Sequence, residues 1–141
     1  MDGTIETNIR IADIKKMKCN EFMNLLTIIA IVIFDTATNT LIGSTRFYEY
    51  KPELSSVAIG YTFLATKFWG GIYNKSVKKL MLDYAFQFVN SVLFHIGATN
   101  IRSQKAILKI GAKKINEVNL DYFERKLLHY EYEIRNDEWN K

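Results

Sequence analysis

The chain has 141 residues, 48% of them hydrophobic and 24% charged, a balance that predicts one globular domain with a single core. The apolar run at Leu25–Phe34 is too short to cross a bilayer, and the N-terminus shows no signal-peptide pattern. The net charge of +4 favours an anionic partner, but no lysine or arginine block resembles a nucleic-acid-binding arm. We therefore expect a cytoplasmic protein with no membrane contact and with nucleic acid as the least favoured partner. Cys19, the single cysteine, has no metal-ligand spacing around it.

The N-terminal third of the chain predicts a weakly patterned segment followed by a β-hairpin. Residues 1–25 form the first segment, with a helical spacing of apolar residues over Ile11–Phe22. Isoleucine-rich Leu26–Phe34 is typical of a strand that is covered on both faces. The turn signal at Asp35–Thr40 and the strand pattern at Thr40–Tyr50 complete an antiparallel hairpin. We assign the remainder, 26–141, to one domain.

The middle of the chain predicts a strand, a glycine-containing turn and a long helix. Over Ser56–Ala65, bulky residues alternate with smaller ones, so Tyr61 and Phe63 are expected on the face of Val57 and Ile59, with something packed closely on the opposite face. Apolar residues recur every three or four positions over Asn74–Val89. The N-terminus of such a helix carries free N–H groups and favours an anion.

A second junction between a strand and a helix follows. Val92–Gly97 predicts a strand, and Arg102–Ile110 predicts a helix capped by Gly111. Two final strands are expected at Lys113–Leu120 and Lys126–Ile134, followed by a polar tail. This order predicts an α/β fold with a mixed sheet and helices packed on it.

Five short segments of the chain occur in the order typical of one enzyme family. They are Ile59-Gly60-Tyr61-Thr62, Phe68-Trp69-Gly70-Gly71, Tyr84-Ala85-Phe86, Asn100-Ile101-Arg102-Ser103-Gln104-Lys105-Ala106 and Lys109-Ile110-Gly111-Ala112. In this order and spacing the chain resembles a GNAT superfamily N-acetyltransferase of the RimJ/RimL-like branch. The resemblance implies the acyl-CoA N-acyltransferase fold, a mostly antiparallel sheet flanked by helices. It also implies acetyl-CoA as co-substrate, with no metal.

The resemblance also implies where the coenzyme binds. Main-chain N–H groups of the turn and helix start would hold the pyrophosphate, the end of the preceding strand would pair with the pantetheine arm, and Lys67 or Lys75 would add positive charge. The implied coenzyme-binding residues are Phe63, Leu64, Ala65, Trp69, Gly70, Gly71, Ile72, Tyr73, Asn74, Lys75, Asn100, Ser103 and Lys105. Asn100 and Ser103 are equally suited to capping the helix that starts at Ile101.

The sequence departs from the family pattern in ways that bear on catalysis. Ile72 stands at a position where the pyrophosphate loop of the family usually has glycine. Ala58 stands where many relatives have a glutamate that acts as a base, and Ile107 stands where a tyrosine often acts as an acid. Proton transfer is therefore left to water, Ser103 or an unplaced residue. His95 and His129 fit sheet histidines with satisfied hydrogen bonds better than they fit bases.

Two functions remain open at this point. The first is an N-acetyltransferase that acts on a primary amine of a small molecule, an amino acid or a protein N-terminus. The alternative is a shortened, non-catalytic domain that binds acetyl-CoA or a protein partner, because the family's first strand and helix are not recognisable in the sequence. Their loss would leave Leu26–Phe34 as an unpaired edge, and we therefore also expect a homodimer.

Overall fold

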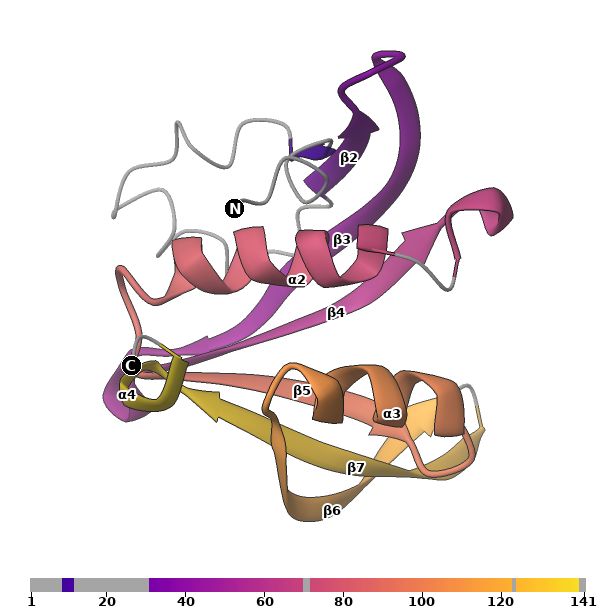
Figure 1. Ribbon diagram of the computed structural model, residues 1–141. Coiled ribbons are helices and arrows are strands. Elements are labelled where there is room, and N and C mark those ends of the chain that lie inside the picture. The colour runs from indigo at the N-terminus through magenta and orange to yellow at the C-terminus, as the bar shows by residue number, and fades with distance from the viewer. Residues whose placement is uncertain (1–8, 12–30, 70–71, 123, 140–141) are drawn as a thin grey trace.

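The computed structural model describes residues 9–11, 31–69, 72–122 and 124–139, and its centre is a mixed sheet (Figure 1). The strands described are β1 Ile9–Ile11, β2 Ile31–Asp35, β3 Thr40–Lys51, β4 Ser56–Leu64, β5 Ser91–Gly97, β6 Lys113–Tyr122 and β7 Arg125–Arg135. The α-helices described are α2 Ile72–Ala85, α3 Ile101–Lys109 and α4 Asn136–Trp139. The strand order is β1-β2-β3-β4-β5-β7-β6, and among these strands the β4–β5 pair alone is parallel. The predicted α/β class with a mostly antiparallel sheet is confirmed.

The first hairpin forms where the sequence predicts it. The side chain of Asp35 accepts hydrogen bonds from the backbone N–H of Ala37 and the hydroxyl of Thr38, both at 3.2 Å, which closes the turn between β2 and β3. Of the expected strand Leu26–Phe34, residues 26–30 lie outside the described part of the chain.

The expectation of a missing first strand is wrong where the structure describes the N-terminal region. Strand β1 pairs antiparallel with β2, with Ile9 opposite Asp35 and Ile11 opposite Ile33. The expected unpaired edge is therefore covered there, and the homodimer loses this support and stays a prediction. The expected helix Ile11–Phe22 begins at a residue that belongs to β1, and its remaining residues lie outside the described part.

Helix α2 packs its apolar stripe on β3 and β4. Val77, Met81 and Leu82 are fully buried, and the ring of Tyr84 lies 6.1 Å from that of Phe47 on β3. The charge of Lys78 predicts a solvated side chain, and this prediction is wrong: Lys78 is buried, because it sits three residues before Met81 and so on the same stripe. Its Nζ donates to the hydroxyl of Thr62 at 2.6 Å, and burial lowers the pKa of Lys78 to about 8.

A β-bulge interrupts the alternation predicted for β4. Gly60 pairs with Arg46 and Phe63 with Ser44, so β4 holds one extra residue between these pairs, and Tyr61 there has a φ of 52°. The bulge turns Thr62 toward α2 and leaves Tyr61 and Phe63 exposed, rather than on the face of Val57 and Ile59. The predicted close packing opposite that face is confirmed at Gly60, where an added Cβ would lie 2.8 Å from the ring of Tyr48.

The C-terminal half extends the sheet beyond β5. Figure 1 shows α2 in front of β3 and β4, and α3 in front of β5 and β7. Gly111 after α3 has a φ of 103°, as its predicted capping role requires. The expected polar tail instead contains α4, whose Trp139 donates from Nε1 to Asp83 of α2 at 2.8 Å. Within the described ranges, no helix is long and apolar enough to span a membrane, and no group of three potential metal ligands is present.

Candidate active site at the opening between β4 and β5

The two parallel strands at the centre of the sheet separate soon after they begin. They pair at three positions, Ser56 with Ser91, Val57 with Val92 and Ala58 with Leu93, and then diverge. Strand β4 continues to Leu64 and β5 to Gly97 beyond the last pair. The β4 edge that faces β5 over Ile59–Leu64 is therefore not paired with β5, and its backbone groups before Leu64 are available to an extended ligand.

Helix α2 begins directly after this free edge. The indole Nε1 of Trp69 donates to the carbonyl oxygen of Leu64 at 2.7 Å, which folds the connection back onto the strand end. Ile72, Tyr73 and Asn74 form the first turn of α2, where backbone N–H groups have no partner within the helix. Gly70 and Gly71 lie outside the described residues.

Helix α3 begins directly after β5 and is held by two side chains. Asn100 caps it, since its Oδ1 accepts the backbone N–H of Ser103 at 3.2 Å. Gln104 donates from Nε2 to the carbonyl oxygens of Gly97 and Ala98, at 2.9 and 3.0 Å. These bonds fix the start of α3 against the end of β5, and the predicted capping role of Asn100 is confirmed.

A cation–π contact joins the two junctions. The guanidinium of Arg102, in the first turn of α3, lies 4.4 Å from the centroid of the Trp69 ring, which is half exposed. The ends of β4 and β5 and the starts of α2 and α3 are therefore gathered at one place. No carboxylate of the described residues forms an ion pair with Arg102, so its charge remains available to an anion.

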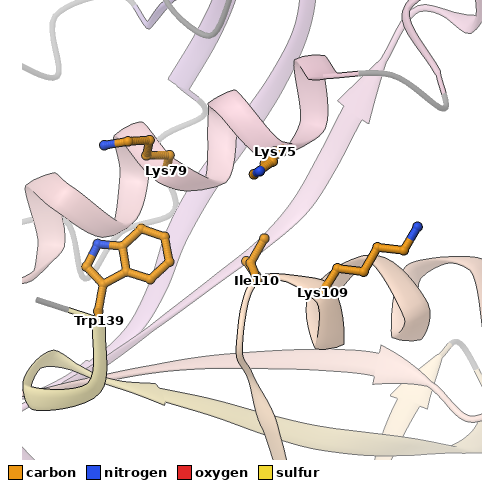
Figure 2. Close-up of a pocket in the computed structure, with 5 residues that line it drawn as sticks. All are labelled: Lys75, Lys79, Lys109, Ile110 and Trp139. Carbon is orange, nitrogen blue, oxygen red and sulfur yellow. The ribbon is translucent and has the colours of Figure 1, made fainter. Parts of the chain in front are cut away.

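A cavity of about 370 Å³ lies between α2 and α3 and is lined by Lys75, Lys79, Lys109, Ile110 and Trp139 (Figure 2). Lys79 pairs with Asp83 at 2.7 Å. No such pair with a described carboxylate is present for Lys75 or Lys109. The cavity therefore combines an aromatic ring with positive charge that is not neutralised, which suits a phosphorylated ligand with a flat ring.

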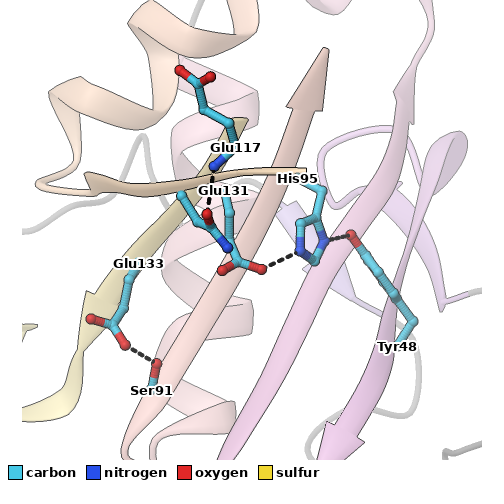
Figure 3. Close-up of polar contacts among 7 residues, drawn as sticks. Tyr48, Ser91, His95, Glu117, Glu131 and Glu133 are labelled. Carbon is cyan, nitrogen blue, oxygen red and sulfur yellow. Dashed lines mark hydrogen bonds and ion pairs between the residues drawn. The ribbon is translucent and has the colours of Figure 1, made fainter. Parts of the chain in front are cut away.

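The opposite face of the sheet carries a chain of three polar side chains (Figure 3). The hydroxyl of Tyr48 on β3 lies 2.7 Å from Nδ1 of His95 on β5, and Nε2 of His95 lies 2.7 Å from Oε2 of Glu131 on β7. The ring of Tyr48 passes over Gly60, and the ring of Tyr61 meets it edge-on at 5.2 Å.

The structure brings together most of the residues that the resemblance implies. They lie at the end of β4, at the connection to α2 and its first turn, and at the start of α3: Phe63, Leu64, Ala65, Trp69, Ile72, Tyr73, Asn74, Asn100 and Ser103. Lys75 lines the cavity beside them. Lys105 is exposed on α3, and Lys67 lies 5.1 Å over the ring of Phe68.

Sequence reasoning missed several residues of this region. Arg102 and Gln104 lie within the recognised motif, yet nothing in their spacing indicated their contacts. Lys109 was part of another motif and received no role, and no pattern marked Trp139 as part of a cavity. Ala58 and Ile107 are both buried apolar residues, so neither side chain supplies an acid or a base.

The chain shares its fold with several solved structures that are described as acetyltransferases. A putative acetyltransferase from T. thermophilus has a TM-score of 0.76 and 20% identity, with 99% of this chain and 90% of that chain covered. A spermidine N-acetyltransferase from Vibrio cholerae, solved with CoA and spermine, has a TM-score of 0.73 and 14% identity, covering 96% and 99%. A GCN5-related N-acetyltransferase from Brucella melitensis has a TM-score of 0.74 and 12% identity, but this chain covers 58% of its length. At these identities the likeness shows the fold.

The sequence itself matches a family model. No curated protein has a significant match to the chain. Residues 6–113, which include β1 to β5 and both junctions between strand and helix, match the model of the acetyltransferase (GNAT) domain. This match covers most of the chain and agrees with the fold and the diverging central strands. The chain therefore belongs to the GNAT acetyltransferase family.

Proposed function

We propose that this protein is an N-acetyltransferase of the RimJ/RimL-like branch that transfers an acetyl group from acetyl-CoA to a primary amine. The observation that carries the proposal is the divergence of β4 and β5 beside two helix N-termini. An extended thioester ligand needs a free strand edge for its amide groups and N–H donors for its phosphates, and this opening offers both.

In this proposal the coenzyme follows the opening from α2 to the end of β4. The first turn of α2, Ile72–Asn74, binds the pyrophosphate through backbone N–H groups, and Arg102, which stacks on Trp69 before that turn, adds positive charge. The β4 edge binds the pantetheine, and N–H groups near Phe63 and Leu64 stabilise negative charge on the thioester oxygen. Holding amine and thioester together supplies much of the rate acceleration.

The lysine cavity fits the nucleotide end of the same ligand. Lys75 and Lys109 face the space between α2 and α3, and Trp139 supplies a flat apolar surface (Figure 2). Coenzyme A carries a phosphorylated ribose and an adenine at this end, which matches two cations and an indole. The cavity residues fit that group by charge and by shape.

The proposed acceptor is a primary amine on a small molecule, an amino acid or a protein N-terminus. A structural neighbour from Vibrio cholerae is a spermidine N-acetyltransferase, so polyamines belong in the acceptor panel. The test measures thiol release from acetyl-CoA with each amine, next to the melting temperature with and without coenzyme. We expect a rise in melting temperature with the coenzyme and thiol release with at least one amine. Absence of both at millimolar coenzyme would contradict the proposal.

A second candidate function is a non-catalytic domain that binds acetyl-CoA or a protein partner. The apolar, buried Ala58 and Ile107 at the family's usual base and acid positions favour it. This candidate predicts a rise in melting temperature with acetyl-CoA but no thiol release with any amine. The same pair of measurements therefore separates the two functions.

Replacing both cavity lysines by glutamate is expected to weaken coenzyme A binding about 10²–10⁴-fold, because two charged hydrogen bonds are lost. Each charged hydrogen bond contributes about 1.5–3 kcal/mol, and about 1.4 kcal/mol corresponds to a factor of ten. Titration calorimetry of Lys75→Glu/Lys109→Glu should show this loss with coenzyme A and a much smaller one with coenzyme A that lacks its 3′-phosphate. Lys126→Glu, an exposed change on β7, is the matched control. Equal losses with both ligands would place the 3′-phosphate elsewhere.

A further inference from the structure

The polar chain on the sheet face opposite α2 crosses the place where β4 and β5 separate. Phe47 pairs with Ile59 and meets Tyr84 of α2, so its neighbour Tyr48 points to the other face. From β3, the Tyr48 ring reaches across β4 at Gly60 to His95 on β5 (Figure 3). Gly60 comes two residues after the last β4–β5 pair, at the start of the opening.

The hydrogen bonds give this chain a direction. An ionised Glu131 can only accept, so Nε2 of His95 carries the proton of that 2.7 Å bond. In neutral imidazole the other nitrogen, Nδ1, is then an acceptor, and the hydroxyl of Tyr48 donates to it at 2.7 Å. A hydroxyl that donates to a histidine oriented by a carboxylate is the arrangement that passes a proton from a substrate to an imidazole.

These three hydrogen-bonded side chains lie on the same face of the sheet as Ala58, the position where many relatives have a glutamate that acts as a base. Ala58 pairs with Tyr48 on one side and Leu93 on the other, and it shares their face of the sheet. The small side chain of Ala58 and the missing side chain of Gly60 leave room for the Tyr48 ring. The carboxylate absent at Ala58 is thus replaced, on the same face, by a hydroxyl backed by His95 and Glu131.

We propose that Tyr48, His95 and Glu131 form a proton relay that accepts the proton of the acceptor amine. This inference rests on the proposed acetyltransferase function and names the proton acceptor within that same site. Tyr48 is the group that meets the amine, whereas His95 stores the proton and Glu131 positions and charges the imidazole. The side chain of His95 is only 7% exposed, so it receives the proton through Tyr48 rather than directly.

The neutral amine nitrogen attacks the thioester carbonyl carbon, and a C–N bond forms while the C–S bond breaks. The nitrogen gives one proton to the Tyr48 oxygen as Tyr48 gives its own proton to Nδ1 of His95. The imidazolium is held against the Glu131 carboxylate and later returns its proton to solvent. The thiolate takes a proton from solvent, so amine and thioester become amide and thiol.

Other charged and titratable groups also lie around the relay. Arg46 on β3 lies 4.6 Å from the ring centroid of Tyr61 on β4, and Glu133 on β7 accepts from the Ser91 hydroxyl at 2.6 Å. On β6, Asn116 lies opposite Glu131, and the carboxylate of Glu117 pairs with Lys114 at 2.6 Å. Among the described residues, Glu131 is the carboxylate in contact with His95.

The test compares pH profiles of kcat for Tyr48→Phe, His95→Gln and Glu131→Gln with the wild type. We expect Tyr48→Phe to lower kcat about 10²–10⁴-fold, with the KM of the amine and coenzyme binding changed less than about threefold. The ascending limb should disappear in Tyr48→Phe and His95→Gln. Glu131→Gln should also lower kcat, because a neutral amide no longer stabilises the imidazolium that forms during transfer. A purely structural role would not move this limb.

The control is Tyr50→Phe, which removes a hydroxyl from the same strand where the side chain packs against the core. It should keep both kcat and the pH profile. Nitrogen NMR of the His95 ring adds a measurement that needs no activity, and in the wild type it should show the proton on Nε2. The Tyr48→Phe variant should fold as the wild type does. A wild type that acetylates amines but tolerates Tyr48→Phe and His95→Gln within twofold would overturn the relay alone. A wild type inactive with every amine would overturn the proposed function, and the relay with it.

Discussion

Phe47→Ala is expected to lower the free energy of unfolding by about 3–5 kcal/mol, the range for truncating a buried phenylalanine. Phe47 is 2% exposed in the middle of β3, pairs with Ile59 and packs against Tyr84 of α2. Alanine would leave a cavity between the sheet and the helix that starts the candidate site. Urea unfolding monitored by circular dichroism measures the change.

The matched control is Phe63→Ala on the neighbouring strand. Phe63 is 63% exposed because the bulge at Tyr61 turns it away from α2. Its truncation should change the free energy of unfolding by no more than about 0.5 kcal/mol. If the two variants lost similar stability, the packing of α2 on Phe47 and the bulge would both be contradicted.

Lys78→Met is expected to change the pH dependence of stability more than any other single lysine change on α2. The pKa of Lys78 is lowered from 10.5 to about 8 by burial, and one pKa unit corresponds to about 1.36 kcal/mol. Between pH 8 and 10.5 the unfolded chain therefore binds the proton that the folded chain has lost, and folding stability rises with pH. Below pH 8 both states hold the proton, and the burial penalty is fully present.

The difference in unfolding free energy between wild type and Lys78→Met should therefore change by about 3 kcal/mol between pH 7 and 10.5, with methionine favoured at the lower pH. Urea unfolding across this pH range gives the difference directly. Lys79→Met is the adjacent control, since Lys79 is half exposed and pairs with Asp83. It should alter stability by about 0.5 kcal/mol or less. If the difference in unfolding free energy between wild type and Lys78→Met did not change with pH, the burial of Lys78 without a charged partner among the described residues would be contradicted.

Much of the fold could be predicted because hydrophobic periodicity is local. The strand at Ser56–Leu64, the helix that follows it and the turn after Asp35 all carry their pattern in consecutive residues. The bulge could not be predicted in this way, since one extra residue at Tyr61 changes every later face without breaking the alternation in sequence. The environment of Lys78 was mispredicted for a related reason. Its charge indicates a solvent-exposed side chain, whereas its spacing to Met81 places it on the buried face of α2.

The candidate site was predictable only where one segment forms it. The helix cap by Asn100 follows from residues three positions apart. The relay of Tyr48, His95 and Glu131 comes from β3, β5 and β7, so its members are brought together by the register of the sheet. Each residue alone read as an ordinary strand residue. Single-sequence patterns cannot supply such long-range register, and the same limit explains why Trp139 was missed.

The short parallel ladder between β4 and β5 has a mechanical consequence. Antiparallel pairing joins β1 to β4 into one half of the sheet and β5 to β7 into the other. Within the sheet that the structure describes, the two halves are joined only by the three paired positions of β4 and β5. Bending strain should therefore concentrate at Ser56–Ala58 and Ser91–Leu93. The shared hydrophobic core limits the motion of the two halves. The stacking of Arg102 on Trp69 also joins them, at the end of the opening where β4 and β5 finish. A ligand bound between α2 and α3 would restrict bending at this short ladder, so that the two halves of the sheet would fluctuate as one body.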